Sequence, residues 1–144
     1  MKNCKELEVW QKSKSLAIDL YKATDAFPRI EQFGLTSQVR RAAVSVTANI
    51  AEGWGRGSTR EYIQCLPIAR GSLMELDTHL IIADELKYLQ SGHAAKFQAR
   101  IESVGQMLNR LIQALRARRP TPHPTSLPAS GNESRTPNPE SRTP

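Results

Sequence analysis

The apolar residues of the chain recur with the spacing of an α-helix, and no segment alternates with the period of two that a β-strand shows. Residues 5–24 are predicted to form a first helix. Its apolar face carries Leu7, Trp10, Ala17, Leu20 and Tyr21. Ser13 and Lys14 interrupt that face. The helix is expected to end at Phe27-Pro28, because the residue before a proline avoids helical backbone angles.

The second predicted helix is apolar on two sides. It begins near Thr36 or Ser37, either of which can cap it, and ends at the glycines of residues 53–57. Its main apolar face consists of Leu35, Val39, Ala42, Ala43, Val46 and Ile50. A smaller apolar line on roughly the opposite side consists of Val44, Ala48 and Ala51. A helix with two apolar sides needs two neighbours, so this line and Trp54 are candidates for a contact with another subunit.

Ser58 and Glu61 form a predicted capping box at the start of a third helix, in which each side chain satisfies the other residue's exposed amide. The apolar face of this helix consists of Tyr62, Leu66, Ala69, Leu73, Leu76, Leu80 and Ala83. Pro67 removes one backbone hydrogen bond, and we expect a bend there and no break. Gly71 either admits a neighbouring helix closely or is a tolerated surface glycine.

A fourth predicted helix covers residues 93–117 after the Ser91-Gly92 turn. Its apolar face consists of Phe97, Ile101, Val104, Leu108, Leu111 and Leu115. Four amphipathic helices with short connections predict an all-α protein, an antiparallel up-and-down four-helix bundle over residues 1–117. Residues 118–144 are rich in Pro, Ser and Thr, and they are predicted to be a disordered tail because they cannot bury enough apolar surface.

Composition adds a moderately basic character. The 144 residues include 20 Lys or Arg and 14 Asp or Glu, a net charge of +6 at pH 7. There is no run of about 18 apolar residues, and the N-terminus lacks the apolar stretch of a signal peptide, so we expect a cytoplasmic protein without membrane contact. Cys4 and Cys65 are too few for a disulfide scaffold and are expected to be thiols.

No residue pattern predicts a metal site or catalysis. The possible metal ligands are Cys4, Cys65, His79, His93 and His123. They include no close pair at the spacings of zinc sites, and no helix carries the Glu-x-x-His pairs of a di-iron bundle. Cys65 lies beside the core and is expected to be inert. The glycines of residues 53–57 follow a helix and lack the ending of a phosphate-binding loop. We expect a protein that is not an enzyme and has no cofactor.

The arginines around the second and third helices are the strongest candidates for binding nucleic acid. They are Arg40, Arg41, Arg56, Arg60 and Arg70. The planar guanidinium donates two parallel hydrogen bonds to a phosphate, and a basic chain binds a nucleic-acid backbone by releasing counterions. The alternative for each arginine is a salt bridge with Glu52, Glu61 or Glu75, or a solvated position. Trp54 either stacks on a base or contacts a subunit.

Several short sequences, in a fixed order, resemble a known family. They are Leu7 to Lys12, Phe33 to Ala42, Ala48 to Gly53, Gly55-Arg56, and Ile68 to Leu76. They resemble the bacterial four-helix bundle proteins first noted as open reading frames in intervening sequences of large-subunit ribosomal RNA genes. The accessory variability determinant of diversity-generating retroelements is similar to these proteins. The resemblance covers about residues 5–116 and excludes the tail.

The resemblance implies a homopentamer of four-helix bundles without known enzymatic activity. In the related retroelement protein, a basic surface is thought to bind nucleic acid and a reverse transcriptase, so the resemblance implies a similar basic surface here. Beside Arg40, Arg41, Arg56 and Arg70, the shared polar positions are Gln38, Asn49, Glu52, Ser72 and Glu75. These five are predicted to form a structural polar network, in which Asn49, Glu52 and Glu75, together with Arg70, make buried hydrogen bonds between helices.

The sequence therefore supports two hypotheses. The first is a non-enzymatic oligomer that binds RNA or single-stranded nucleic acid through a ring of arginines, since several copies of a modestly basic subunit make a strongly basic surface. The alternative is a scaffold or adaptor that docks a partner protein, such as a reverse transcriptase, without touching nucleic acid.

Overall fold

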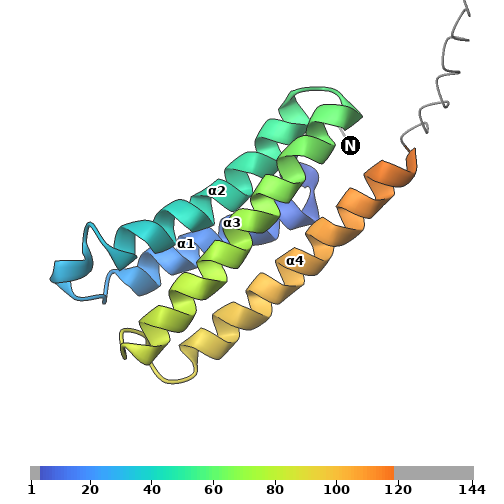
Figure 1. Cartoon of the computed structure of the whole chain (residues 1–144). Helices are drawn as coiled ribbons and strands as arrows, with labels where there is room; N and C mark the ends of the chain where they lie inside the picture. Colours follow the sequence, from blue (N-terminus) through green and yellow to red (C-terminus); the bar gives the residue numbers. More distant parts are fainter. Residues whose placement is uncertain (1–3, 119–144) are drawn as a thin grey trace, which may run out of the picture.

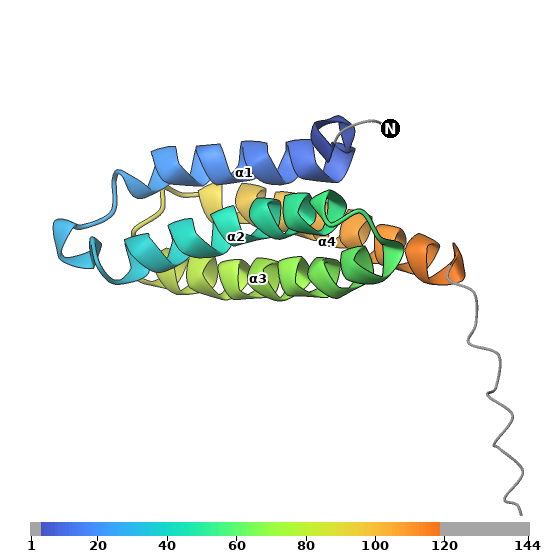
Figure 2. The same ribbon diagram turned by 90° about the horizontal axis from the view of Figure 1, so that it is seen from above.

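The computed structural model describes residues 4–118, which form four long helices and two 3-10 turns. The helices are α1 (Glu8–Thr24), α2 (Leu35–Gly55), α3 (Thr59–Glu85) and α4 (His93–Arg118), and the turns are Cys4–Glu6 and Arg29–Glu31. Successive helices run in opposite directions (Figure 1, Figure 2). The predicted all-α, up-and-down architecture is confirmed, and residues 4–118 contain no strand. The predicted tail, apart from Arg118 in α4, lies outside the described residues.

One apolar core runs the length of the bundle, and all four helices contribute to it. Its fully covered members include Leu20 of α1, Ile50 of α2, Leu76 of α3 and Leu108 of α4. The predicted apolar face of α3 is confirmed at every position, and that of α2 at every position except the half-buried Leu35. Burial of these side chains is the main force that holds the helices together.

The apolar face of α1 differs from the prediction. Ser13 is part of the core, because its hydroxyl donates a hydrogen bond to the Trp10 carbonyl (2.9 Å) and accepts one from the Thr47 hydroxyl (3.1 Å). A buried hydroxyl with both partners costs little. Tyr21, which was predicted to face the core, is 43% exposed, and Leu16 is buried instead.

The last turns of α4 also differ from the prediction. Ile112 is buried, whereas the predicted core residues Leu111 and Leu115 are half-buried. The buried face steps by four residues from Val104 through Leu108 to Ile112, so it turns away from the three-residue step that leads to Leu111.

The two glycines that matter for helix packing have opposite surroundings. A Cβ atom added to Gly53 of α2 would lie 2.7 Å from Cδ2 of Tyr62 and 2.9 Å from Cβ of Cys65. A Cβ atom added to Gly71 would meet nothing within 4 Å, so Gly71 is a surface glycine. Close approach between α2 and α3 therefore depends on Gly53. The helix α3 continues through Pro67 without a break, as expected.

Side chains accept hydrogen bonds from backbone N–H groups at the starts of α2 and α3, whereas Leu7, at the N-cap of α1, has no side-chain acceptor. Ser58 Oγ accepts a hydrogen bond from the Glu61 backbone N–H at 3.2 Å, which is one half of the predicted capping box; the return bond to the Glu61 carboxylate is absent among the described residues. The helix α2 begins at Leu35, at least two residues earlier than the predicted caps allow. The backbone N–H of Leu35 donates to the carboxylate of Glu31 at 2.9 Å. Glu31, from the preceding turn, therefore accepts the hydrogen bond that Thr36 or Ser37 was expected to accept as the cap.

The helix pairs are not packed equally. The contact between α2 and α3 is the most extensive, and the contact between α1 and α4 is the smallest of the four neighbouring pairs. Between α1 and α4, Arg100 Nη1 donates to Asp19 Oδ2 at 2.7 Å.

Within residues 4–118, none of the helices has the combination of length and hydropathy needed to cross a bilayer.

Candidate nucleic-acid interface

Arg40 is held between α1 and α2. Its Nε donates to Thr24 Oγ1 at 2.9 Å, and its Nη2 donates to the Tyr21 carbonyl at 3.1 Å and to Asp25 Oδ1 at 2.9 Å. The guanidinium carbon lies 4.7 Å from the centroid of the Tyr21 ring. These contacts occupy three of the five N–H donors, so Arg40 ties α1 to α2 and is a weaker candidate for the predicted phosphate contact than a fully solvated arginine.

Arg56 and Arg70 also have partners. Arg56 Nη2 donates to Glu52 of the preceding turn, and this hydrogen bond and charge raise the pKa of the guanidinium above its usual value. Arg70 Nη1 donates to Asn109 Oδ1 of α4 at 2.9 Å. Both contacts lie at the surface, where such pairs are weak, so either arginine remains able to bind phosphate.

Arg41 and Arg60 are exposed, and neither has an ion pair or side-chain hydrogen bond within residues 4–118. Arg41 lies in α2 about 22 Å along the helix axis before Arg56, the residue that follows the helix, at a rise of about 1.5 Å per residue. The five predicted arginines therefore do not form one surface. Arg40 and Arg41 lie toward one end of the bundle, and Arg56 and Arg60 lie at the other.

The second of these ends contains a pocket of about 370 Å³ between the α2–α3 turn and the end of α4. It is lined by Gly53, Trp54, Gly57, Ser58, Thr59, Tyr62 and Leu115. Arg56 and Arg60 flank the turn, and Arg116 and Arg118 lie in the last turn of α4; all four are exposed. We call Trp54, Arg56, Arg60, Arg116 and Arg118 the basic end of the bundle.

Sequence reasoning missed Arg116 and Arg118 because it considered the charges of the second and third helices alone. The signal was present in the predicted topology. In an up-and-down bundle the second and fourth helices end on the same side, which brings the arginines after Leu115 to the turn that contains Trp54.

The Trp54 ring is half-buried in this pocket and packs edge-on against Tyr62, with centroids 5.9 Å apart and an interplanar angle of 84°. The Tyr62 hydroxyl is buried and has no hydrogen-bond partner among the described residues. Burial, with a smaller contribution from Cys4, raises the pKa of Tyr62 to about 12. The pocket thus has a firmly packed aromatic wall, and part of Trp54 remains accessible.

The predicted polar network is only partly present. The Ser45 and Ser72 hydroxyls lie 2.8 Å apart across α2 and α3, and Asn49 Nδ2 donates to the Ser45 carbonyl (2.8 Å) and hydroxyl (3.1 Å). The expectation of a hydrogen bond between helices was wrong for Asn49, because its partner Ser45 lies in the same helix. It was also wrong for Glu52 and Glu75, which do not join helices. Each is exposed and pairs with a residue one turn later in its own helix, Arg56 or His79. Gln38 is exposed.

The second apolar line of α2 is uncovered within one subunit. Val44 and Ala48 are exposed and Ala51 is half-buried. Beside Val44, the exposed Ile18 and Tyr21 of α1 complete a groove of about 500 Å³, which we call the α1–α2 groove. Its lining is almost entirely apolar, with Lys14 and Lys22 also lining it.

The cysteines are free thiols, Cys65 buried and Cys4 half-buried. In the part of the chain that the structure describes, no three His, Cys, Asp or Glu side chains lie together as metal ligands do.

Comparisons with known proteins agree with this architecture. A family model described as 23S rRNA-intervening sequence protein matches residues 5–110. The fold is similar to the crystal structure of a protein of unknown function from the S23 ribosomal protein family of Bacteroides thetaiotaomicron, with a TM-score of 0.65 and 22% sequence identity over 73% of this chain and 98% of that chain. No curated protein matches the chain. Because the family model spans most of the bundle, the chain belongs to the 23S rRNA-intervening sequence protein family.

Proposed function

We propose that this protein is a non-enzymatic, oligomeric bundle that binds RNA or single-stranded DNA at its basic end. The observation that carries the proposal is that four exposed arginines lie close in the chain to residues that line the pocket holding Trp54, two beside the α2–α3 turn and two in the last turn of α4. Arginine guanidinium groups bind phosphate, and a tryptophan ring stacks on bases of any sequence. Proteins that bind single strands without sequence preference combine these two features.

Association between copies is the second part of the proposal. The α1–α2 groove exposes Ile18, Tyr21 and Val44, and an apolar patch with a polar rim is typical of a protein contact site. Family resemblance favours a pentamer. Several copies would bring several basic ends to one nucleic-acid strand and raise its overall affinity. Light scattering tests this part: we expect an oligomer for the unchanged chain and smaller species for Val44→Glu, whereas a monomer at micromolar concentration would overturn it.

A direct binding assay tests the nucleic-acid contact. The chain has two tryptophans, so Trp10→Phe leaves Trp54 as the one tryptophan, whose emission is excited selectively at wavelengths beyond the tyrosine absorption. We expect a 12-nucleotide oligo(U) RNA to quench Trp54 and to bind more weakly as salt rises from about 50 to 200 mM. Arg60→Ala with Arg116→Ala should weaken binding roughly fivefold, because two phosphate contacts are lost.

The control for this assay is Arg29→Ala with Arg41→Ala, which removes the same charge from exposed sites away from the basic end. Equal weakening by both double variants would show that net charge alone matters. Binding that is insensitive to salt and leaves Trp54 fluorescence unchanged would contradict the proposal.

A scaffold or adaptor role is the alternative, and the α1–α2 groove favours it because an apolar groove also fits a partner protein. In that case a polymerase partner, such as a reverse transcriptase, is retained in a pull-down after nuclease treatment, and purified protein does not bind RNA. The two assays together separate the two functions.

A further inference from the structure

The contact between α1 and α4 contains a groove that the proposed function does not use. Three adjoining hollows follow it, with volumes of about 340, 230 and 180 Å³. The first two share Asp19, His93 and Phe97, and the second and third share Arg100. The hollows are therefore one continuous depression along the two helices, which we call the α1–α4 groove.

Both walls of this groove carry polar residues at the same spacing. The wall from α1 carries Lys12, Ser15, Asp19 and Lys22, and the wall from α4 carries His93, Lys96, Arg100 and Ser103. Steps of three, four and three residues keep side chains on one line along an α-helix. Two polar rows thus face each other across the groove. This pattern is readable in the sequence once the pairing of α1 with α4 is known.

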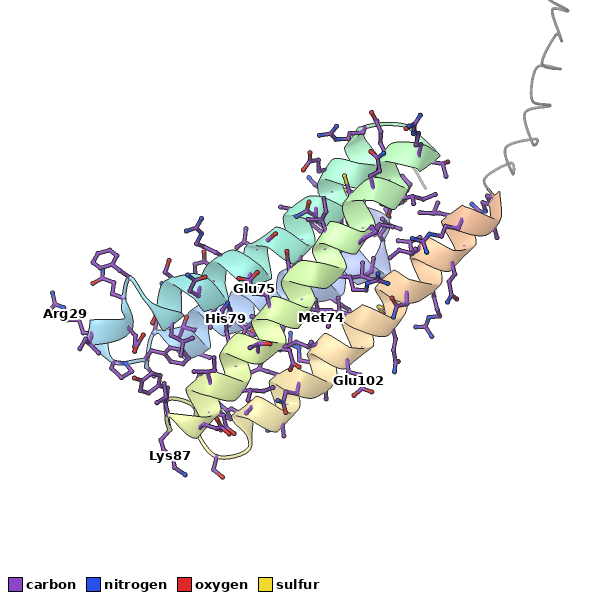
Figure 3. All side chains as sticks on the ribbon, viewed as in Figure 1. Arg29, Met74, Glu75, His79, Lys87 and Glu102 are labelled. Carbon is purple, nitrogen blue, oxygen red and sulfur yellow. The ribbon has the colours of Figure 1, made fainter. Side chains whose placement is uncertain are left out.

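Positive charge dominates the groove. Four cationic side chains line it, those of Lys12, Lys22, Lys96 and Arg100, against the single carboxylate of Asp19. Arg100 donates to that carboxylate at 2.7 Å and offsets its charge. The other acidic residue of this part of α4, Glu102, is exposed and points away from the bundle (Figure 3).

The lysines of the groove are available to a ligand. Lys22 and Lys96 have no ion-pair partner within residues 4–118. Lys12 Nζ lies 3.7 Å from Glu8 Oε1, with both side chains at least half exposed, and surface pairs of this kind are weak. Three ammonium groups therefore project along a depression whose walls also offer the hydroxyls of Ser15 and Ser103.

We infer that the α1–α4 groove binds a linear chain of phosphate groups, either the sugar–phosphate backbone of a single-stranded nucleic acid or inorganic polyphosphate. The lysines contact successive phosphates and release counterions, and the serine hydroxyls donate hydrogen bonds. From Lys12 to Lys22 the wall extends for about 15 Å, at a rise of about 1.5 Å per residue, so several phosphates fit along it.

The groove recognises phosphates and not bases. Its six-membered aromatic rings are those of Phe97, which is buried, and Tyr88, which is half-buried and donates a hydrogen bond to Glu31 at 3.3 Å; the half-buried His93 adds one imidazole. Phe97 is covered and Tyr88 packs against Phe27, so the groove has no tryptophan-like platform for stacking bases, in contrast to Trp54. The groove extends toward the basic end, where α1 begins and α4 ends, so one strand can occupy both sites (Figure 2). The groove is nevertheless a separate site with its own test.

The test uses the full chain and a fluorescent 12-nucleotide strand made entirely of abasic sites, which offers a backbone without bases. Lys22→Ala with Lys96→Ala should weaken its binding roughly tenfold at about 50 mM salt, and should lower the slope of log affinity against log salt by about 1.4, the value for two lost phosphate contacts on a single strand. Arg29→Ala with Arg41→Ala is the control of equal charge and should change the affinity less than about twofold.

A second variant protects the test against misfolding. Asp19→Asn removes the one carboxylate of the groove and should strengthen binding of the abasic strand roughly threefold, because it adds net positive charge. If inorganic polyphosphate displaces the labelled abasic strand, the groove recognises phosphate groups alone. If polyphosphate does not displace it and the unlabelled abasic strand does, the groove recognises the sugar–phosphate backbone. Both results support the inference. Unchanged binding in Lys22→Ala with Lys96→Ala and in Asp19→Asn overturns it. If oligo(U) RNA does not quench Trp54 but the abasic strand still binds, the proposed binding at the basic end is wrong and the inference about the α1–α4 groove remains supported.

Discussion

The α2–α3 and α1–α4 interfaces are built from side chains of different size. Between α2 and α3, Gly53 and Ala69 allow the helices to approach, and the Ser45 and Ser72 hydroxyls meet directly at 2.8 Å. Between α1 and α4, long charged side chains face each other, and the Asp19–Arg100 ion pair bridges the gap. The first interface is closed, and the second is left open as a groove.

This difference separates packing from binding. Most of the short sequences by which the chain resembles its family lie in α2 and α3, and the structure places them at or beside the closed interface. Three of the four cations of the α1–α4 groove, Lys22, Lys96 and Arg100, lie outside those sequences, and Lys12 is the last residue of the first of them. The resemblance therefore reports mainly how the bundle packs, and the binding surface must be found from the charges that the packing leaves exposed.

The largest expected effect concerns Tyr62, whose hydroxyl is buried beside the closed interface without a partner. Its pKa is raised to about 12 in the folded chain. The free energy of unfolding is therefore unaffected by ionisation of this group below the usual tyrosine pKa of about 10, and it decreases as the pH rises from there toward 12. Two pKa units correspond to roughly 3 kcal/mol at most. Urea unfolding of the chain and of Tyr62→Phe at pH 9 and pH 11.5 should show the variant gaining most of this difference at the higher pH. A constant difference would contradict the assigned burial.

Gly53→Ala should open the closed interface. The new Cβ would lie within 3 Å of both Tyr62 and Cys65, and overpacking of this kind costs about 1–3 kcal/mol. The matched control is Gly71→Ala in the neighbouring helix, where the new Cβ meets nothing and a gain of up to about 1 kcal/mol is expected from helix propensity. Denaturant titrations that rank the two variants in the opposite order would show that α2 and α3 do not pack closely at Gly53.

Ser72→Ala tests the hydroxyl pair at the same interface. Loss of the hydrogen bond to Ser45 should lower the free energy of unfolding by about 1 kcal/mol. Thr78→Ala is the control, since its hydroxyl bonds only to the Met74 carbonyl of its own helix, and its effect should stay below about 0.5 kcal/mol. If Ser72→Ala and Thr78→Ala lower stability equally in thermal unfolding, the hydrogen bond between Ser45 and Ser72 does not stabilise the interface.

Asp19→Asn should change stability least, although it breaks the ion pair of the open interface. Both partners are more than a third exposed, and pairs of this kind contribute less than about 1 kcal/mol. A loss above about 2 kcal/mol in thermal unfolding would mean that α1 and α4 depend on this pair and that the groove is not free to accept a ligand.

The sequence predicted the helices because their apolar residues keep a helical period over long segments. It failed at Ser13 and Tyr21, since hydropathy does not reveal that a hydroxyl will find a partner on the next helix. It failed at Arg40 for a related reason: the contacts with Thr24 and Asp25 join residues far apart in the chain. Such pairings follow from the rotation of each helix about its axis, which spacing within one helix leaves undetermined.

The candidate site shows the same division. Trp54, Arg56 and Arg60 were found from sequence because they are neighbours in the chain. Arg116 and Arg118 join them only through the topology. The rows of the α1–α4 groove were missed because each row is half of a site, and one row alone is an ordinary solvated helix face.

The central claim is that a strand binds to the open part of the bundle and not to its closed interface. Amide NMR spectra recorded during titration with a 12-nucleotide oligo(dT) test it most directly. We expect shifts in α1 from Lys12 to Lys22, in α4 from His93 to Ser103, and at the indole N–H of Trp54. Shifts confined to the outer face of α2 and α3, around Ser45, Ser72 and Glu75, or no shifts at all, would contradict the claim.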